Sequence, residues 1–456
     1  MRCTCSMEDD FAGWPLPTGK RSFDMAPKTL LVFCDGTGKD GTLASPMKSS
    51  EMKHLVSDMP GFDIKDLREG GASLDRKAKS AASDGGGHTE YATNVLRLSR
   101  SVLPQDKNGN RQIVYYQSGV GSEADFAGSQ VTGAALLQAL GTAVASKVRD
   151  AYAFIAQNFA DGDEICLFGF SRGAYTARKL SGLIDAIGLL SRKNLSYFFE
   201  IWRQLIEKEP ITKFPDTRFP DIKCVGVWDT VGSVFNEINA LNIKDTSLPA
   251  TVKVALHAVS LQENREVFLP TLWSFPSGGL KDGQVLKQVW FPGAHSDIGG
   301  GYKRHELADI SVYWMAGEIE EFVNLDVKFL RSFAQPNPDP WGTSQPHNAY
   351  METKPEYQFL VGHETRLESL QITKESMFHE SIRFSPQKLD SPDSVITMTI
   401  IKEEFGSGFE PQYSPLNDFE QYCKDHWGVR GILEARHGIE DPEAVWGPRI
   451  VRSVPI

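Results

Sequence analysis

The sequence has little cysteine and no stretch that would mark it for secretion. Six cysteines among 456 residues give no disulfide framework. Cys34, Cys166 and Cys224 lie inside apolar runs, so we expect buried thiols, a reducing compartment and a cytoplasmic location. Because the first 27 residues contain no apolar stretch of signal-peptide length, we do not expect classical secretion.

Long hydrophobic runs and an excess of basic residues are also missing. No run approaches the roughly 18 apolar residues of a membrane-spanning helix, so we expect no such helix. The 48 basic and 59 acidic side chains give a net charge of −11. This charge gives the chain no electrostatic reason to bind nucleic acid, and it disfavours tight docking on anionic lipid. With 41% apolar and 23% charged residues, the sequence predicts a globular protein with an ample core.

Short apolar runs alternate with helical patterns along the chain. Buried strands are predicted at residues 29–34, 112–116, 164–168, 222–228 and 285–291. Helices are predicted after a cap at Thr93-Asn94 and at residues 133–158, 174–190 and 252–261. This alternation predicts an α/β fold with a mostly parallel sheet and helices on both faces.

The composition changes several times along the chain and suggests a domain organisation. We expect a flexible leader at residues 1–27 and a catalytic domain at residues 28–330. Residues 39–90 are polar and rich in glycine, which predicts a long mobile insertion. Residues 191–220 are aromatic and charged and predict a cap segment, and residues 331–456 predict a C-terminal extension that packs on the core.

The pattern Gly169-Phe-Ser-Arg-Gly173 lies between the strand predicted at residues 164–168 and the next helix. A sharp turn of this kind is typical of a nucleophile elbow, which holds a serine hydroxyl above the sheet. The flanking glycines are needed because a Cβ atom would clash where the chain folds back. We predict that Ser171 is a nucleophile; a glycine-rich turn with a capping serine is the alternative.

A serine nucleophile needs a base, and the base needs an acid that orients it. In this type of fold the acid and then the histidine follow the serine, each at the end of a strand. Asp229 and His295 each follow a predicted strand directly, and we predict them as the acid and the base. Asp297 and Asp309 remain alternative acids, and His257 remains an alternative base.

Ester hydrolysis also needs N–H donors that point at the developing oxyanion. One donor is predicted at the backbone N–H of Arg172, directly after the nucleophile. The loop Asp35-Gly-Thr-Gly38 follows the first strand, and we predict the second donor there, at Gly36 or Thr37. An ordinary turn is the alternative for this loop.

Four blocks of sequence carry a resemblance to a known family. They are Phe33-Cys-Asp-Gly-Thr37, Gly169-Phe-Ser-Arg-Gly-Ala174, Trp228-Asp-Thr-Val-Gly232 and Ala294-His-Ser-Asp-Ile-Gly-Gly-Gly-Tyr302. Through these blocks the chain resembles, over roughly residues 28–385, the catalytic domain of the class 1 type VI secretion phospholipase effectors.

The resemblance implies an α/β-hydrolase sheet and a Ser–Asp–His triad at Ser171, Asp229 and His295. In the effectors it also implies phospholipase activity on membrane lipids. The chain departs from the family pattern at Lys39, where the family commonly has Asn. No counterpart of the effectors' large membrane-docking modules is visible, so the resemblance covers the hydrolase chemistry rather than membrane docking.

The sequence therefore predicts a serine hydrolase, lipase-like or phospholipase-like, that cleaves carboxylic esters through an acyl-enzyme without metal or cofactor. A soluble esterase, a thioesterase or an acyltransferase would use the same residues, and a non-catalytic binding module could keep the fold. The expected partners are a lipid or small-molecule ester and, transiently, a membrane surface; the oligomeric state is left open. An apolar stretch of small residues at 131–148 either lines an acyl tunnel or covers the sheet.

Other chemistries fit the sequence less well. An aspartate-nucleophile phosphatase would need its nucleophile two positions before Asp35, where Phe33 stands. A dinucleotide site at Gly119-Val-Gly-Ser-Glu-Ala124 lacks a continuous helix after it. No His or Cys pair has zinc spacing, which leaves Asp35, Asp229 and Asp297 as the ligands available to a divalent ion.

Overall fold

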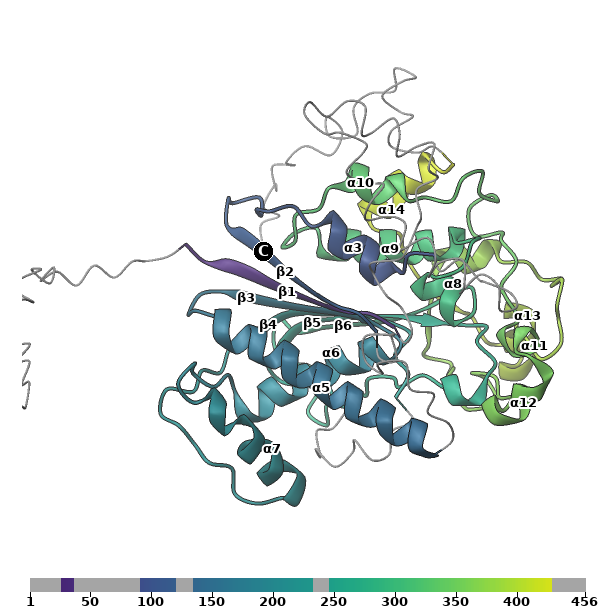
Figure 1. Ribbon diagram of the computed structural model, residues 1–456. Coiled ribbons are helices and arrows are strands. Elements are labelled where there is room, and N and C mark those ends of the chain that lie inside the picture. The colour runs from purple at the N-terminus through teal and green to yellow at the C-terminus, as the bar shows by residue number, and fades with distance from the viewer. Residues whose placement is uncertain (1–25, 37–90, 120–133, 233–245, 429–456) are drawn as a thin grey trace, which may run out of the picture.

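The computed structural model describes residues 26–36, 91–119, 134–232 and 246–428, and these form an α/β fold around one sheet (Figure 1). The sheet has eight strands in the order β2-β1-β3-β4-β5-β6-β7-β8, and every neighbouring pair is parallel. The strands are β1 (Lys28–Cys34), β2 (Arg111–Gln117), β3 (Glu164–Phe170), β4 (Ile222–Trp228), β5 (Val252–Ser260), β6 (Val285–Phe291), β7 (Met377–His379) and β8 (Gln412–Ser414).

The central strands are buried on both faces, which explains their continuous apolar sequences. On β1, Leu30 and Val32 point into one core cluster, and Leu31 and Phe33 point into another on the opposite face. Successive side chains of a strand alternate between faces, so both faces of β1 need apolar residues.

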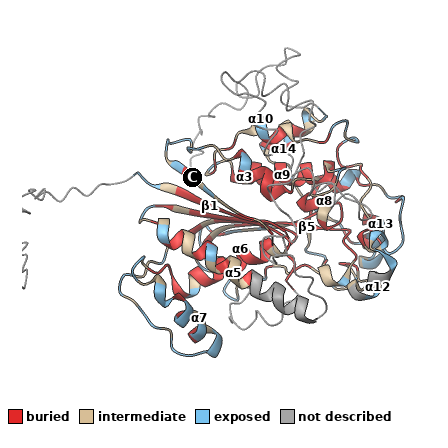
Figure 2. Cartoon of the chain, viewed as in Figure 1, coloured by how far each residue is buried: buried red, intermediate tan, exposed pale blue. Residues whose placement is uncertain are grey.

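Helices cover both faces of the sheet. One layer contains α5 (Ala134–Asn158), α6 (Arg172–Ile187) and α7 (Phe198–Glu207); the other contains α3 (Asn94–Ser101), α9 (Glu306–Ile319) and α14 (Asp418–Asp425). Buried residues concentrate on the sheet and on the helix faces that contact it (Figure 2). Shorter elements are η1 (Leu195–Tyr197), η3 (Glu266–Phe268), α8 (His295–Gly299), α10 (Val327–Ser332), α11 (Ala349–Glu352), α12 (Pro355–Val361), η4 (Glu380–Phe384) and α13 (Met398–Phe405).

The predicted fold class is confirmed, and so are most of the predicted elements. Thr93 caps α3, since its hydroxyl accepts a hydrogen bond from the N–H of Leu96. The predicted buried thiols Cys34, Cys166 and Cys224 are buried and free.

The helix predicted at residues 252–261 is wrong, because these residues form strand β5. A short apolar run fits a buried strand and a buried helix equally well, and here β5 pairs with β4 on one side and β6 on the other. The three-residue strands β7 and β8 had no counterpart in the sequence analysis.

The predicted cap segment at residues 191–220 contains η1 and α7, and it lies away from the predicted nucleophile. Leu189 and Arg218 exchange backbone hydrogen bonds at the C-terminal end of α6, whereas Ser171 precedes the N-terminal end of this helix. The segment therefore does not cover Ser171.

The other predicted divisions are only partly covered by the described residues. The leader lies almost wholly outside them, and the insertion at residues 39–90 lies wholly outside them. The C-terminal part contributes β7 and β8 to the same sheet as the strands before residue 330. No helix in the described ranges is long and apolar enough to span a membrane.

Candidate active site

Ser171 lies at a sharp turn between β3 and α6, at the carboxyl edge of the sheet. Its backbone has φ +58° and ψ −125°, a strained conformation for a residue with a side chain. A Cβ atom on Gly169 would lie 2.4 Å from the carbonyl oxygen of Gly173, and one on Gly173 would lie 2.1 Å from that of Cys34. Both predicted elbow glycines are therefore required by the close approach of three backbone segments.

Asp229 directly follows β4 and is fully buried. Its Oδ1 accepts a hydrogen bond of 2.9 Å from the N–H of Ser260, and its Oδ2 lies 2.6 Å from Nδ1 of His295. Both oxygens also accept hydrogen bonds from the guanidinium of Arg366, at 3.1 and 3.0 Å. Burial alone would raise the pKa of Asp229, but the charge of Arg366 and the hydrogen bond from His295 outweigh burial and lower it.

His295 follows the end of β6 and begins α8. Its ring packs between Phe170, with ring centroids 4.6 Å apart, and Phe268, at 4.9 Å. Burial lowers the pKa of His295 from its ordinary value of 6.5, although the neighbouring Asp229 opposes this shift. The imidazole is therefore neutral at neutral pH.

The two nitrogens of His295 differ in their surroundings. An ionised carboxylate can only accept a hydrogen bond, so Nδ1 carries the proton that is donated to Asp229. Nε2 then carries a lone pair, and it is buried without a hydrogen-bond partner among the described residues. The hydroxyl of Ser171 likewise has no such partner in this part of the chain, and Phe170, the residue before it, contacts the imidazole ring.

Gly36, in the predicted oxyanion loop, lies against the turn at Ser171. A Cβ atom on Gly36 would be 3.4 Å from Cβ of Ser171. The N–H of Gly36 donates a 2.7 Å hydrogen bond to Oδ1 of Asp35, whose Oδ2 accepts hydrogen bonds from Thr93 and Tyr116. Gly36 is thus anchored beside Ser171, and its role as an oxyanion donor remains a prediction.

Of the other two residues predicted to supply a donor, the structure describes Arg172 but not Thr37. Arg172 is the first residue of α6, and burial lowers the pKa of its side chain to about 10. Thr37 lies outside the described residues.

The carboxylates of the two alternative acids bond residues other than His295. Asp297 accepts a 2.7 Å hydrogen bond from Nδ1 of His347, and Asp309 forms an ion pair of 2.6 Å with Arg97. Neither carboxylate makes a hydrogen bond to His295.

The alternative base lies inside the sheet rather than on a helix. His257 is fully buried on β5, where Nε2 accepts a hydrogen bond from the N–H of Thr230 and Nδ1 lies 3.2 Å from Gln288. Burial lowers the pKa of His257 to about 3, so its imidazole stays neutral. Both of its nitrogens are occupied, which leaves none for a serine hydroxyl.

The sequence analysis missed three charged residues that surround the histidine. Glu263 accepts hydrogen bonds from the side chain of Arg265 at 2.7 and 2.9 Å, and from the N–H of His295 at 3.1 Å. Arg366 binds the predicted acid. Polar residues shortly after β5 are a signal that could have located Glu263, as it located Asp229 after β4. No sequence pattern marks Arg366, which lies in the loop between α12 and β7.

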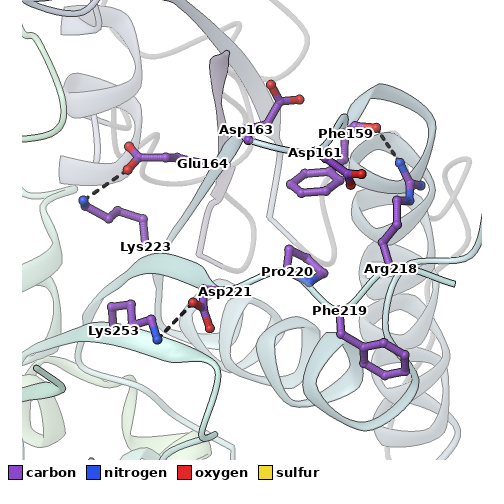
Figure 3. A pocket seen from close by; sticks show the side chains of 11 residues that line it. Phe159, Asp161, Asp163, Glu164, Arg218, Phe219, Pro220, Asp221, Lys223 and Lys253 are labelled. Atoms are coloured by element: carbon purple, nitrogen blue, oxygen red, sulfur yellow. Dashed lines mark hydrogen bonds and ion pairs between the residues drawn. The ribbon is translucent and has the colours of Figure 1, made fainter. Parts of the chain in front are cut away.

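A cavity of about 500 Å³ opens at the other edge of the sheet, where β3, β4 and β5 begin (Figure 3). Lys223 pairs with Glu164 at 3.1 Å, and Lys253 pairs with Asp221 at 3.0 Å. Because these charges pair with one another and Ser171 lies at the opposite edge, we assign this cavity no part in the candidate active site. Among the described residues, no group of three or more His, Cys, Asp or Glu side chains is arranged to hold a metal ion.

Comparison with known proteins identifies proteins that are similar to part of the chain. A protein of Saccharomyces cerevisiae named uncharacterized protein YEL023C is 31% identical over 201 residues, which are 39% of this chain and 29% of the yeast protein. The Tle1 effector, solved bound to the VgrG spike from the Type 6 secretion system, is 22% identical with a TM-score of 0.32; the match covers 60% of this chain and 51% of the effector chain. An uncharacterized protein from Pseudomonas aeruginosa is 16% identical with a TM-score of 0.32, and the match covers 65% and 46% of the two chains. The matched region thus spans less than a third of the yeast protein and about half of each solved chain.

The family comparison covers more than half of the sequence. The family described as "T6SS, Phospholipase effector Tle1-like, catalytic domain" matches residues 79–318. This span contains Ser171, Asp229 and His295 and ends before Arg366, and the match confirms the predicted resemblance. The chain belongs to the family of Tle1-like phospholipase effector catalytic domains.

Proposed function

We propose that the protein is a serine hydrolase that cleaves carboxylic esters, with Ser171 as nucleophile, His295 as base and Asp229 as the orienting acid. The observation that carries the proposal is the state of the histidine. Nδ1 bonds the buried Asp229 at 2.6 Å, while Nε2 has no hydrogen-bond partner among the described residues. A histidine held in this tautomer is equipped to accept a proton from a hydroxyl.

In the proposed reaction, Nε2 of His295 accepts the hydroxyl proton as Oγ of Ser171 attacks the carbonyl carbon of the ester. The imidazolium then donates this proton to the departing alcohol oxygen, and the acyl group remains bonded to Ser171. A water molecule then gives a proton to Nε2 and attacks the acyl carbon, the bond between that carbon and Oγ of Ser171 breaks, and Nε2 returns the proton to Oγ as the carboxylic acid leaves. The carboxylate of Asp229 stays ionised throughout and stabilises the imidazolium.

The tetrahedral intermediate needs N–H donors, which we assign to the N–H of Arg172 and to the Gly36–Thr37 loop. The position of Gly36 beside Ser171 supports the assignment. In the described structure the N–H of Gly36 is bound to Asp35, so its use would require that this hydrogen bond be exchanged for one to the substrate.

Family membership supports a hydrolase of the lipase or phospholipase type in general. We propose a carboxylic ester with an acyl chain as substrate, in the form of a phospholipid or lysophospholipid. The net charge of −11 favours monomeric or lightly bound esters over attack on an anionic bilayer. A soluble esterase, a thioesterase or an acyltransferase with the same residues is the second candidate.

The substrate class can be tested with p-nitrophenyl esters of increasing chain length, assayed beside phosphatidylcholine and phosphatidylethanolamine. We expect fatty acid to be released from a phospholipid and hydrolysis to improve with acyl length, with Ser171→Ala as the inactive control. Activity on short esters alone, with no fatty acid released from either phospholipid, would remove the lipase proposal and leave a soluble esterase. No turnover of any ester by folded protein would favour the binding module.

A further inference from the structure

Arg366 is a fully buried cation whose guanidinium is committed to the candidate acid. Nη1 bonds Oδ1 of Asp229 at 3.1 Å, and Nη2 bonds Oδ2 at 3.0 Å. Nη2 also donates a 2.9 Å hydrogen bond to the carbonyl oxygen of Phe268, whose ring contacts His295. A planar guanidinium that bonds both oxygens fixes the plane of a carboxylate as well as its charge.

The orientation of Asp229 follows from its full set of hydrogen bonds. Oδ1 accepts from Ser260 and Arg366, and Oδ2 accepts from His295 and Arg366. Rotation of the carboxylate would break several charge-assisted hydrogen bonds at a fully buried site, where each of them is strong. Arg366 thereby keeps Oδ2 turned toward Nδ1 of the histidine.

The charges around His295 are balanced before the histidine is protonated. Asp229 is paired with Arg366, and Glu263, which accepts the N–H of His295, is paired with Arg265. Two carboxylates and two guanidiniums thus face the imidazole from the ends of β4 and β5 and from the loop before β7. A proton on the imidazole adds an unbalanced positive charge to this buried group.

The remaining charges near α8 are engaged with one another. Asp297, on α8 itself, accepts hydrogen bonds from Nδ1 and from the N–H of His347. Phe170 contacts the imidazole from the end of β3 and carries no charge. Burial and, less strongly, the charge of Arg265 lower the pKa of His295, and Arg366 acts on the histidine through Asp229.

We propose that Arg366 is a positioning residue of the reaction: its guanidinium holds Asp229 ionised and turned toward Nδ1, and its charge keeps His295 in the neutral form that accepts the Ser171 proton. This inference rests on the proposed function. It also extends the candidate site beyond the family match, since Arg366 lies after residue 318 and the match ends there.

The test is the pH dependence of kcat/KM for Arg366→Met in the full chain, beside the matched control Arg97→Met. Arg97 is a buried cation paired with Asp309, and neither of these side chains bonds His295 or Asp229. Loss of Arg366 removes a positive charge and lets Asp229 take up a proton more easily. Both changes move the acid limb of the profile, which is the fall of kcat/KM at low pH, to higher pH. We expect a shift of about one pH unit or more for Arg366→Met. Arg97→Met should lower the Tm without moving the limb.

Arg366→Lys distinguishes the effect of the positive charge from the effect of the hydrogen-bond geometry. It is also the variant to use if Arg366→Met does not fold. A single ammonium keeps the charge but cannot bond both oxygens in one plane. We expect the acid limb to stay near the wild-type position while kcat falls by about tenfold to a hundredfold. A folded Arg366→Met with an unshifted limb, or an Arg366→Lys with wild-type kcat, would overturn the inference. Covalent labelling of Ser171 with a fluorophosphonate in the same variants distinguishes the two failures. If Ser171 is labelled, the proposed function stands even when the inference about Arg366 fails.

Discussion

Two sets of a serine, a histidine and an acid can be compared among the described residues, and only one of them has the form of an active site. The first is Ser171, His295 and Asp229. In the second, Nδ1 of His379 lies 2.8 Å from the hydroxyl of Ser381, and Nε2 lies 2.7 Å from Oε1 of Glu420. Both sets are buried, and residue types alone do not distinguish them.

The difference lies in which nitrogen of the histidine is left available. In the second set the N–H of Ser381 also donates to Nδ1 of His379, so Nδ1 is the acceptor and Nε2 donates to Glu420. Both nitrogens are therefore occupied. In the first set Nδ1 is bound and Nε2 is not.

The serines differ in backbone as well. Ser171 has φ +58° at a strand–helix turn, whereas Ser381 lies inside η4 with no solvent exposure. The second set joins η4 to α14 and packs His379 on Phe291 of the sheet, with ring centroids 4.3 Å apart. The comparison teaches that the unpartnered Nε2 and the strained serine, rather than the triplet itself, indicate catalysis.

The largest difference between the two sets is expected when each serine is replaced by alanine. Ser171→Ala should lower kcat for ester hydrolysis by roughly 10⁴-fold or more, because it removes the hydroxyl on which the acyl-enzyme is proposed to form. Ser381→Ala should leave kcat near the wild-type value. Steady-state rates on one ester, with circular dichroism as the check on folding, measure both; similar losses in the two variants would contradict the comparison.

The next largest effect concerns the acid of the first set. Asp229→Asn should lower kcat by up to about 10⁴-fold, since an amide no longer stabilises the imidazolium or fixes its tautomer. Asp297→Asn is the control, because Asp297 bonds His347 instead of His295. The loss of kcat in this variant should be far smaller. A fully active Asp229→Asn beside an inactive Asp297→Asn would move the assignment of the acid to Asp297.

A smaller effect, on stability rather than rate, is expected in the second set. Glu420 accepts hydrogen bonds from His379 and, through Oε2, from the N–H of Asn417. Glu420→Gln places an amide NH₂ against one of these donors, so the free energy of unfolding should fall by about 1–3 kcal/mol. Urea denaturation measures this loss. The rate per folded molecule should not change, and a large loss of kcat in stable Glu420→Gln protein would speak against a purely structural role.

The smallest expected effect is the position of the acid limb in the wild-type enzyme. The proposed base must be neutral, and burial lowers the pKa of His295 below 6.5. Protonation therefore removes activity only below this pH, so kcat/KM should fall below pH 6.5 and stay flat from about pH 7 to 8. A profile of kcat/KM against pH on a soluble ester measures the limb; an acid limb above pH 7 would contradict the neutral, buried histidine.

The sequence predicted what short local patterns encode. Continuous apolar runs located five strands, and the glycine spacing around Ser171 located the elbow, since only glycine fits where three backbone segments meet. Asp229 and His295 could be predicted because each directly follows a strand of the sheet. The order of serine, acid and histidine along the chain also predicted that Asp229 pairs with His295, and the two side chains are hydrogen-bonded.

The sequence could not predict what depends on tertiary contacts. The run around His257 became a strand because two neighbouring strands pair with it. The three-residue strand β7 is too short to give a period. Arg366 lies 137 residues from Asp229 in a loop without a motif, and only the folded chain brings the two together.

Covalent labelling with a fluorophosphonate tests the central claim most directly, because the two serine sets compete for the reagent within one molecule. The reagent reacts with a serine hydroxyl that an adjacent base activates. Intact mass and peptide mapping of folded protein should give one adduct per chain, on Ser171 and not on Ser381, with no adduct in Ser171→Ala. An unlabelled Ser171 in folded protein, or labelling that persists in Ser171→Ala, would contradict the account.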